Sequence, residues 1–155
     1  MKKVIFNAII EKAIANEEEA NRFYLKLADR VTDKSAKDTL LYLAKEEMGH
    51  KNNLIRYRQE GLINNATNIE EVPDCKVADF VSSPDIQYNM DSKDAYLLAS
   101  ARELNSYNLY VGMASVHPEG EIRNMLLKMA DEELKHKEKV EYLYSNTAFV
   151  QTDGG

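Results

Sequence analysis

Two stretches of sequence decide how this chain folds: LLYLAKEEMGHK at residues 40–51 and LLKMADEELKHK at residues 126–137. The second begins 86 residues after the first, and the two are identical at seven of twelve positions. Each contains Glu-x-x-His, a spacing that places both side chains on one face of a helix, about one turn apart. Glutamate and histidine are common ligands of transition metals. The two stretches therefore predict an internal repeat that carries a metal site.

The same offset relates residues outside these stretches. Six side chains form two matching sets, in which each member of the second set lies 86 residues after its counterpart: Glu17, Glu47 and His50, then Glu103, Glu133 and His136. Tyr24 and Tyr110 also correspond, each seven residues after the first glutamate of its set. One Glu-x-x-His can arise by chance. Two copies, joined by two glutamates at the same offset, indicate metal binding.

Apolar residues recur every three or four positions in four segments, which predicts four long helices. We expect them at about 4–30, 35–60, 92–116 and 119–144, with Gly61 ending the second and Asp91 or Ser92 capping the third. The link at 31–34 is short, so its helices are antiparallel neighbours. Residues 61–91 are too many for a tight turn and form a crossover, with one short helical turn near 77–81. The expected fold class is an all-α four-helix bundle in one domain, residues 1–155.

All six residues fall on the inward stripe of their helices. In the first helix, Glu17 stands in step with Ala13 and Ala20. Four inward carboxylates would repel one another and be poorly hydrated unless a positive charge offset them. Two divalent cations would bring the formal net charge from −6 to −6 + 4 = −2. The pattern thus predicts a two-metal centre inside the bundle.

Simpler interpretations stay open for single residues. Most helical glutamates are solvated, and five here are interpreted as surface residues: Glu18, Glu19, Glu46, Glu132 and Glu138. Protonated carboxyls or Glu–Lys pairs explain one or two inward acids, but not four acids and two histidines in phase. Tyr24 and Tyr110 could hydrogen-bond a ligand or carry a transient radical, and they could equally be core aromatics with a bonded hydroxyl. His117 is expected to be a polar residue at a helix end rather than a ligand.

Composition excludes several classes of protein. A net charge of −6 argues against a nucleic-acid surface, which needs a basic face. No apolar run approaches the roughly 20 residues that span a membrane. The apolar residues 4–10 loosely imitate a secretory signal, but Glu11 and Lys12 interrupt them, so a cytoplasmic location is expected. The single cysteine, Cys75, excludes an internal disulfide and any four-thiolate iron site of the rubredoxin type within this sequence.

The motifs ExxAxxFY at 17–24 and AKEEMGH at 44–50, with their counterparts at 103–110 and 130–136, resemble rubrerythrin-like members of the ferritin-like superfamily. The resemblance covers all four expected helices. It implies an antiparallel bundle with a left-handed crossover and a carboxylate-bridged di-iron site. It also implies roles for the six residues: Glu47 and Glu133 bridge the metals, His50 and His136 each cap one, and Glu17 and Glu103 are terminal ligands.

The resemblance further implies an oxidoreductase that acts in oxidative stress and reduces peroxide or oxygen, or oxidises ferrous iron. Its cofactor would be two iron ions, with manganese as the alternative. Two departures from rubrerythrins matter. The cysteines of a rubredoxin domain are absent, so electrons would come from an external donor such as a separate rubredoxin. Ser106 stands where rubrerythrins carry a further glutamate in the third helix.

The symmetric six-residue set also resembles the bacterioferritin ferroxidase centre. The alternative function is therefore a non-catalytic metal-binding or iron-handling protein, and a metal-free interaction module is a third possibility. In bacterioferritin a methionine beside the bridging glutamate binds haem between subunits. Met48 has that place in the sequence, but it lies one step off the inward stripe, so we expect a surface or dimer-contact residue rather than a haem ligand. A homodimer is expected from the resemblance.

Overall fold

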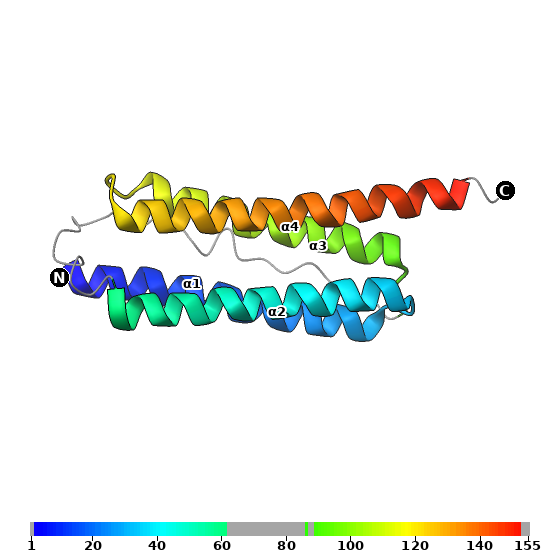
Figure 1. Ribbon diagram of the computed structural model, residues 1–155, viewed down its shortest axis with the longest axis horizontal. Helices are drawn as coiled ribbons and strands as arrows, with labels where there is room; N and C mark the ends of the chain where they lie inside the picture. Colours follow the sequence, from blue (N-terminus) through cyan, green and yellow to red (C-terminus); the bar gives the residue numbers. More distant parts are fainter. Residues whose placement is uncertain (1, 62–85, 87–88, 153–155) are drawn as a thin grey trace.

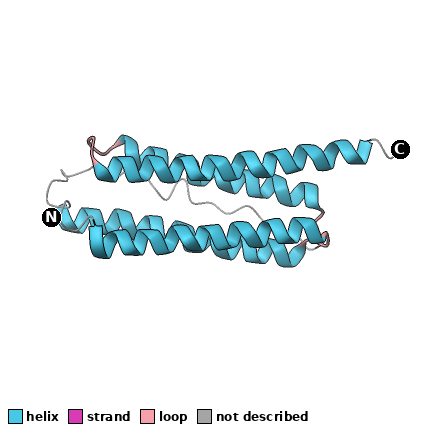
Figure 2. Cartoon of the chain, in the orientation of Figure 1, coloured by secondary structure: helices cyan, strands magenta, loops and turns pink. Residues whose placement is uncertain are grey.

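The computed structural model describes residues 2–61, 86 and 89–152, which contain four long α-helices (Figures 1 and 2). Helix α1 spans Lys2–Arg30, α2 spans Lys34–Arg56, α3 spans Ser92–Ser115 and α4 spans Glu121–Thr152. One π-helical turn, η1, follows α2 at Tyr57–Gly61. No strand occurs in these residues, and none of their helices is both long and apolar enough to cross a membrane. The expected all-α bundle is confirmed.

Side-chain caps fix the starts of two helices. The carboxylate of Asp33 accepts a hydrogen bond from the backbone N–H of Ala36 at 2.8 Å, at the start of α2. At the start of α3, the carboxylate of Asp91 accepts one from the N–H of Asp94, also at 2.8 Å. Each cap satisfies one of the donors that the first turn of a helix leaves unpaired. The expected cap at Asp91 is confirmed.

Two helix ends differ from those expected. Helix α2 ends at Arg56, and the residues from there to Gly61 form the wider π-helical turn η1. Helix α4 begins at Glu121 and extends eight residues beyond Tyr144, to Thr152. Ser145, Asn146 and Thr147 are only weak helix breakers, and the sequence has no glycine or proline between residues 121 and 153. The helical turn expected at 77–81 lies outside the described residues.

The helices form two antiparallel pairs. Helix α1 packs mainly against α2, and α3 against α4, as the lower and upper pairs of Figure 1 show. The two pairs meet where α1 ends and α3 begins, because the backbone N–H of Met90 donates to the carbonyl of Arg30 at 3.0 Å. Val31 and Met90 are both buried at this junction. Each pair is one copy of the sequence repeat.

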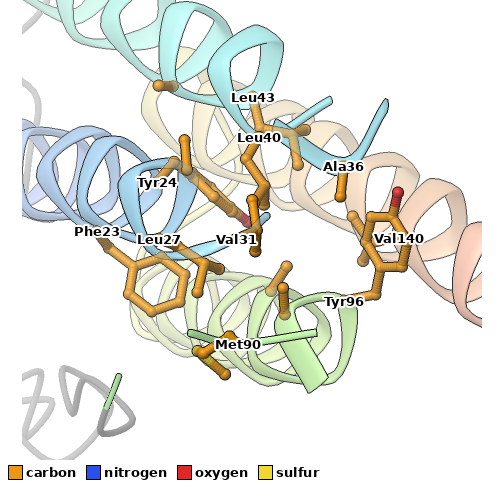
Figure 3. Packing of buried hydrophobic residues seen from close by; sticks show 14 residues of the cluster. Phe23, Tyr24, Leu27, Val31, Ala36, Leu40, Leu43, Met90, Tyr96 and Val140 are labelled. Atoms are coloured by element: carbon orange, nitrogen blue, oxygen red, sulfur yellow. The ribbon is translucent and has the colours of Figure 1, made fainter. Parts of the chain in front are cut away.

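The buried core consists of two apolar clusters, one toward each end of the bundle. The first includes Ile10, Leu54, Met113 and Leu126. The second includes residues of all four helices, several of which are labelled in Figure 3: Leu27, Leu40, Leu43, Tyr96 and Val140. In each helix the buried glutamate lies in sequence between a member of the first cluster and a member of the second. Apolar side chains therefore enclose the glutamates from both ends of the bundle.

Candidate metal centre

The structure brings the six sequence-predicted residues together in the centre of the bundle. Each of the four helices contributes one glutamate, and α2 and α4 each add a histidine one turn further along. All four glutamates are at most 1% exposed, and His136 is 7% exposed. The side chain of His50 is 12% exposed. The inward phase that the sequence predicts is therefore observed for every one of the six residues.

The six residues form two overlapping groups. One consists of Glu17, Glu47, His50 and Glu133, and the other of Glu47, Glu103, Glu133 and His136. Within each group, one potential ligand atom of every residue lies within 4.8 Å of the others. The two groups share two residues, Glu47 and Glu133, and only these two. Two adjacent cation positions with a pair of common carboxylates fit this arrangement.

Each histidine faces the glutamate of the other half of the repeat. The Nδ1 atom of His50 lies 3.2 Å from Glu133 Oε1, and Nδ1 of His136 lies 3.0 Å from Glu47 Oε1. The two imidazole rings stack, with centroids 5.5 Å apart and planes 8° from parallel. The repeat in sequence thus becomes an approximate two-fold arrangement in space, in which each position draws ligands from both halves.

The two tyrosines predicted from the sequence likewise bond to glutamates of the opposite half of the repeat. The hydroxyl of Tyr110 donates to Glu17 Oε1 at 2.6 Å, and the hydroxyl of Tyr24 donates to Glu103 Oε1. Both phenols are fully buried, and burial raises the pKa of each well above its usual value. They therefore stay protonated and act as hydrogen-bond donors to the two glutamates that the groups do not share.

Within the described part of the chain, four carboxylate oxygens of the site lack any hydrogen-bond partner: Oε2 of Glu17, Glu47, Glu103 and Glu133. A buried carboxylate oxygen without a partner carries a large desolvation cost. One carboxylate oxygen without a hydrogen bond on each of the four glutamates is what a site for cations that take oxygen ligands would present. The donor set, four carboxylates and two imidazoles, suits divalent iron or manganese. The residues present therefore fit a pair of such ions.

Without metal, the cluster holds protons. Burial raises the pKa of both Glu17 and Glu133 well above the usual carboxyl value, and repulsion by Glu47 adds to the increase. Burial acts in the same direction on Glu47, but its interactions with Glu17 and His136 outweigh burial and lower the pKa. Burial lowers the pKa of His136, yet its hydrogen bonds to two carboxylates raise it to about 10. Cations entering the site must displace these protons.

A buried polar cluster beside the site was not predicted from the sequence. The guanidinium of Arg102, only 1% exposed, donates to the carbonyl and side-chain oxygens of Asn16 at 3.1 and 3.0 Å and to Ser106 Oγ at 2.6 Å. The side-chain amide of Asn16 donates to the hydroxyl of Tyr110 at 3.3 Å. The cluster is thus hydrogen-bonded to the Tyr110 hydroxyl, which in turn donates to Glu17. One signal was available: Arg102 lies 86 residues after Asn16, the offset of the ligands.

His117 is not part of the metal cluster. Its Nδ1 lies 2.7 Å from the carbonyl oxygen of Met113, one turn back in α3, and its backbone N–H donates to Ala114. The residue is 4% exposed and closes the end of the helix, as the sequence predicts. None of the groups of potential metal ligands in the described residues includes it.

Two comparisons with known proteins give matches that cover most of the chain. A family model described as Rubrerythrin matches residues 8–144, which include all six clustered residues. Among solved structures, a candidate ferritin-like diiron-carboxylate protein from Thermotoga maritima has a similar fold, with a TM-score of 0.62 and 22% sequence identity. The match covers 90% of this chain and 93% of that chain. None of the curated proteins gives a significant match.

Proposed function

The chain belongs to the rubrerythrin family, and from this premise we propose that it is a non-haem di-iron oxidoreductase that reduces peroxide or dioxygen. The observation that carries the proposal is the pair of four-residue groups that share Glu47 and Glu133. Carboxylates and imidazoles suit iron, and shared carboxylates can hold two ions close together. The four carboxylate oxygens without a hydrogen bond support the same assignment.

The proposed roles of the ligands follow from which group each residue joins. Glu47 and Glu133 belong to both groups, so they would bridge the two ions. The remaining ligands belong to one group each: Glu17 and His50 at one position, Glu103 and His136 at the other. When bound, two iron ions supply the two electrons that split an O–O bond. Manganese is accepted by the same donor types, so iron is our choice rather than the only fit.

The reduction of hydrogen peroxide to two water molecules consumes two electrons and two protons. The protonated hydroxyls of Tyr24 and Tyr110 each donate a hydrogen bond to a glutamate that belongs to one ligand group only. These hydrogen bonds hold the two carboxylates in a fixed orientation. The two apolar clusters exclude water from both ends of the site. In such surroundings the hydrogen bonds to the glutamates are stronger than they would be in water.

These 155 residues do not themselves provide a rubredoxin-type electron donor. Within these 155 residues the single cysteine, Cys75, cannot build a four-thiolate iron centre. We therefore propose a separate electron-transfer protein, such as a rubredoxin, as the partner that restores the reduced state.

A second function is favoured by one observation, the environment of Ser106. This residue stands where rubrerythrins carry a further glutamate, and its Oγ accepts hydrogen bonds from Arg102 and Asn16. It therefore offers no additional carboxylate, and the site keeps a symmetric six-residue set. Such a set favours oxidation and handling of ferrous iron, as in bacterioferritin.

Rapid mixing separates these functions. The metal-free protein is loaded with two equivalents of ferrous iron under anaerobic conditions and mixed with hydrogen peroxide while its absorption is recorded. Peroxide reductase activity predicts oxidation well above the rate of free ferrous iron, and turnover when reductant is supplied. Iron handling predicts stoichiometric oxidation without turnover. Oxidation at the rate of the free ion would refute both.

Replacement of the shared carboxylates tests the site itself. Glu47→Ala combined with Glu133→Ala should abolish binding of two ions per chain, because both positions lose two ligands. The matched control is Asp38→Ala with Glu138→Ala, which removes two exposed acids from the same helices. Retention of two ions per chain by the first variant would contradict the bridging assignment.

A further inference from the structure

Within the part of the chain that the structure describes, the candidate metal site is most exposed along one edge. The four glutamates are at most 1% exposed, whereas the side chains of His50 and His136 are 12% and 9% exposed. Apolar clusters lie toward both ends of the bundle. Among the described residues of the site, the stacked pair of histidines is therefore the side most exposed to solvent.

A cavity of about 820 Å³ lies against this edge, between α2 and α4. His50 forms part of its wall, together with two acids that correspond in the repeat, Glu46 and Glu132. Asn53 and Asn124 add uncharged polar groups to the wall, and Lys128 adds one positive charge. The rest of the wall is apolar and includes Leu54, Met125 and Met129, so the cavity carries a few charged and polar groups and reaches the exposed edge of the site at His50.

Glu46 and the two histidines could together hold a cation. One potential ligand atom of each of Glu46, His50 and His136 lies within 4.8 Å of the other two. Two imidazoles and one carboxylate are a known donor set for divalent iron. Glu132 is not a member of this group, and its carboxylate lies 3.9 Å from Lys135 Nζ instead. The two halves of the repeat therefore differ at this position. The sequence predicts that Glu46 is a solvated surface residue, whereas in the structure it lies beside the two histidines.

The three-residue group shares both histidines with the inner site. Their hydrogen bonds to Glu133 and Glu47 use Nδ1, which leaves each ring a second nitrogen. Each ring can therefore face an inner glutamate with Nδ1 and offer its other nitrogen to a cation beside Glu46.

We propose that Glu46, His50 and His136 form an outer cation position, through which ferrous iron passes from the cavity between α2 and α4 to the inner site. The proposal rests on the proposed function in one respect, that the inner site binds divalent cations. Glu46 supplies the negative charge that attracts the ion and holds it beside the histidines. Negatively lined clefts raise the association rates of cations by about 10-fold or more.

The test compares Glu46→Gln with Glu132→Gln. Both remove one negative charge from the same cavity and keep the size of the side chain, but only the first removes a member of the three-residue group. Metal-free protein is mixed with cobalt(II) chloride in a stopped-flow instrument, and the visible absorption of the protein-bound ion is followed. Equilibrium titration then gives the number of ions bound per chain, and thermal melting confirms that each variant is folded.

We expect Glu46→Gln to bind two ions per chain at equilibrium but to bind them about 10-fold more slowly than the unaltered chain, whereas Glu132→Gln slows binding less than about 2-fold. Equal rates in both variants, slowed or not, would overturn the proposal, because the group would then have no role beyond its charge. A loss of bound ions in Glu46→Gln would also overturn it, since Glu46 would be an inner ligand. Absence of two-ion binding by the unaltered chain would instead refute the proposed function on which the inference rests.

Discussion

Replacing Glu133 with glutamine should stabilise the metal-free protein and at the same time prevent binding of two ions. In the folded chain Glu133 is fully buried, and burial together with repulsion by Glu47 and Glu103 raises its pKa well above 4.5. Folding at pH 7 therefore requires the carboxyl to take up a proton or to remain charged among other carboxylates. Glutamine has nearly the same shape, is neutral, and keeps an oxygen to accept the hydrogen bond of His50.

The size of the gain is bounded by the cost of that proton. From the unfolded value of 4.5 to pH 7 is 2.5 pH units, and each unit corresponds to about 1.36 kcal/mol, so the gain is at most about 3.4 kcal/mol. Packing changes around the new amide reduce this, and we expect about 2 kcal/mol. For a chain of 155 residues that corresponds to a rise in Tm of about 4–8 °C.

Thermal melting followed by circular dichroism, with a chelator present, measures this difference. Glu138→Gln on the exposed face of α4 is the control and should leave Tm unchanged. The sign of the pH dependence follows from the raised pKa: the contribution of Glu133 to stability is fully present below pH 4.5 and is lost as pH rises through the folded pKa. The advantage of the variant should therefore shrink as pH falls from 7 toward 4.5.

Two results would refute this reasoning. A Glu133→Gln protein that melts at a lower temperature than the unaltered chain without metal would show that the carboxylate cluster does not destabilise the fold. An advantage that is the same at pH 5 and pH 7 would show that proton uptake is not its source. With saturating metal the order should reverse, because only the unaltered chain gains the free energy of binding two ions.

Four other perturbations have defined outcomes. Tyr110→Phe removes the donor to Glu17 and should cost about 1–3 kcal/mol in urea unfolding, whereas Tyr107→Phe, half-buried on the same helix, should change stability by less than about 0.5 kcal/mol. Leu40→Ala creates a cavity at a fully buried position and should cost about 2–5 kcal/mol in the same assay; a smaller cost would mean that the second apolar cluster collapses around the gap. Removal of metal by a chelator should lower the free energy of unfolding by about 2.7 kcal/mol for each ion bound, relative to protein with free metal at 100 times its Kd, and an unchanged Tm would argue against a metal site. Metal affinity, measured by titration, should rise from pH 6 to pH 8, because the pKa of about 10 for His136 means that binding must release its proton; pH-independent affinity would contradict this.

Much of the fold follows from the sequence, because local spacing determines it. Apolar residues at intervals of three and four define the inward face of each helix. The cap at Asp91 is a local hydrogen bond, so its residue type identifies the start of α3. The ends of the helices follow less directly from local sequence. Helix α4 runs on to Thr152 through residues of weak helix propensity, and at Thr147 the side chain simply bonds to the preceding turn, to the carbonyl of Leu143 at 2.9 Å.

The six candidate ligands were also determined by the sequence, since one offset of 86 residues and one helical phase select them. Which of them approach one another was decided only by the tertiary structure. Periodicity places Glu47 and His50 on the same helix face, but the shortest contact of His50 is to Glu133, on another helix. The same holds for the contact between Asn16 and Arg102 and for the cavity beside Glu46. Periodicity fixes the direction of a side chain from its own helix, whereas distances between helices depend on how all four pack.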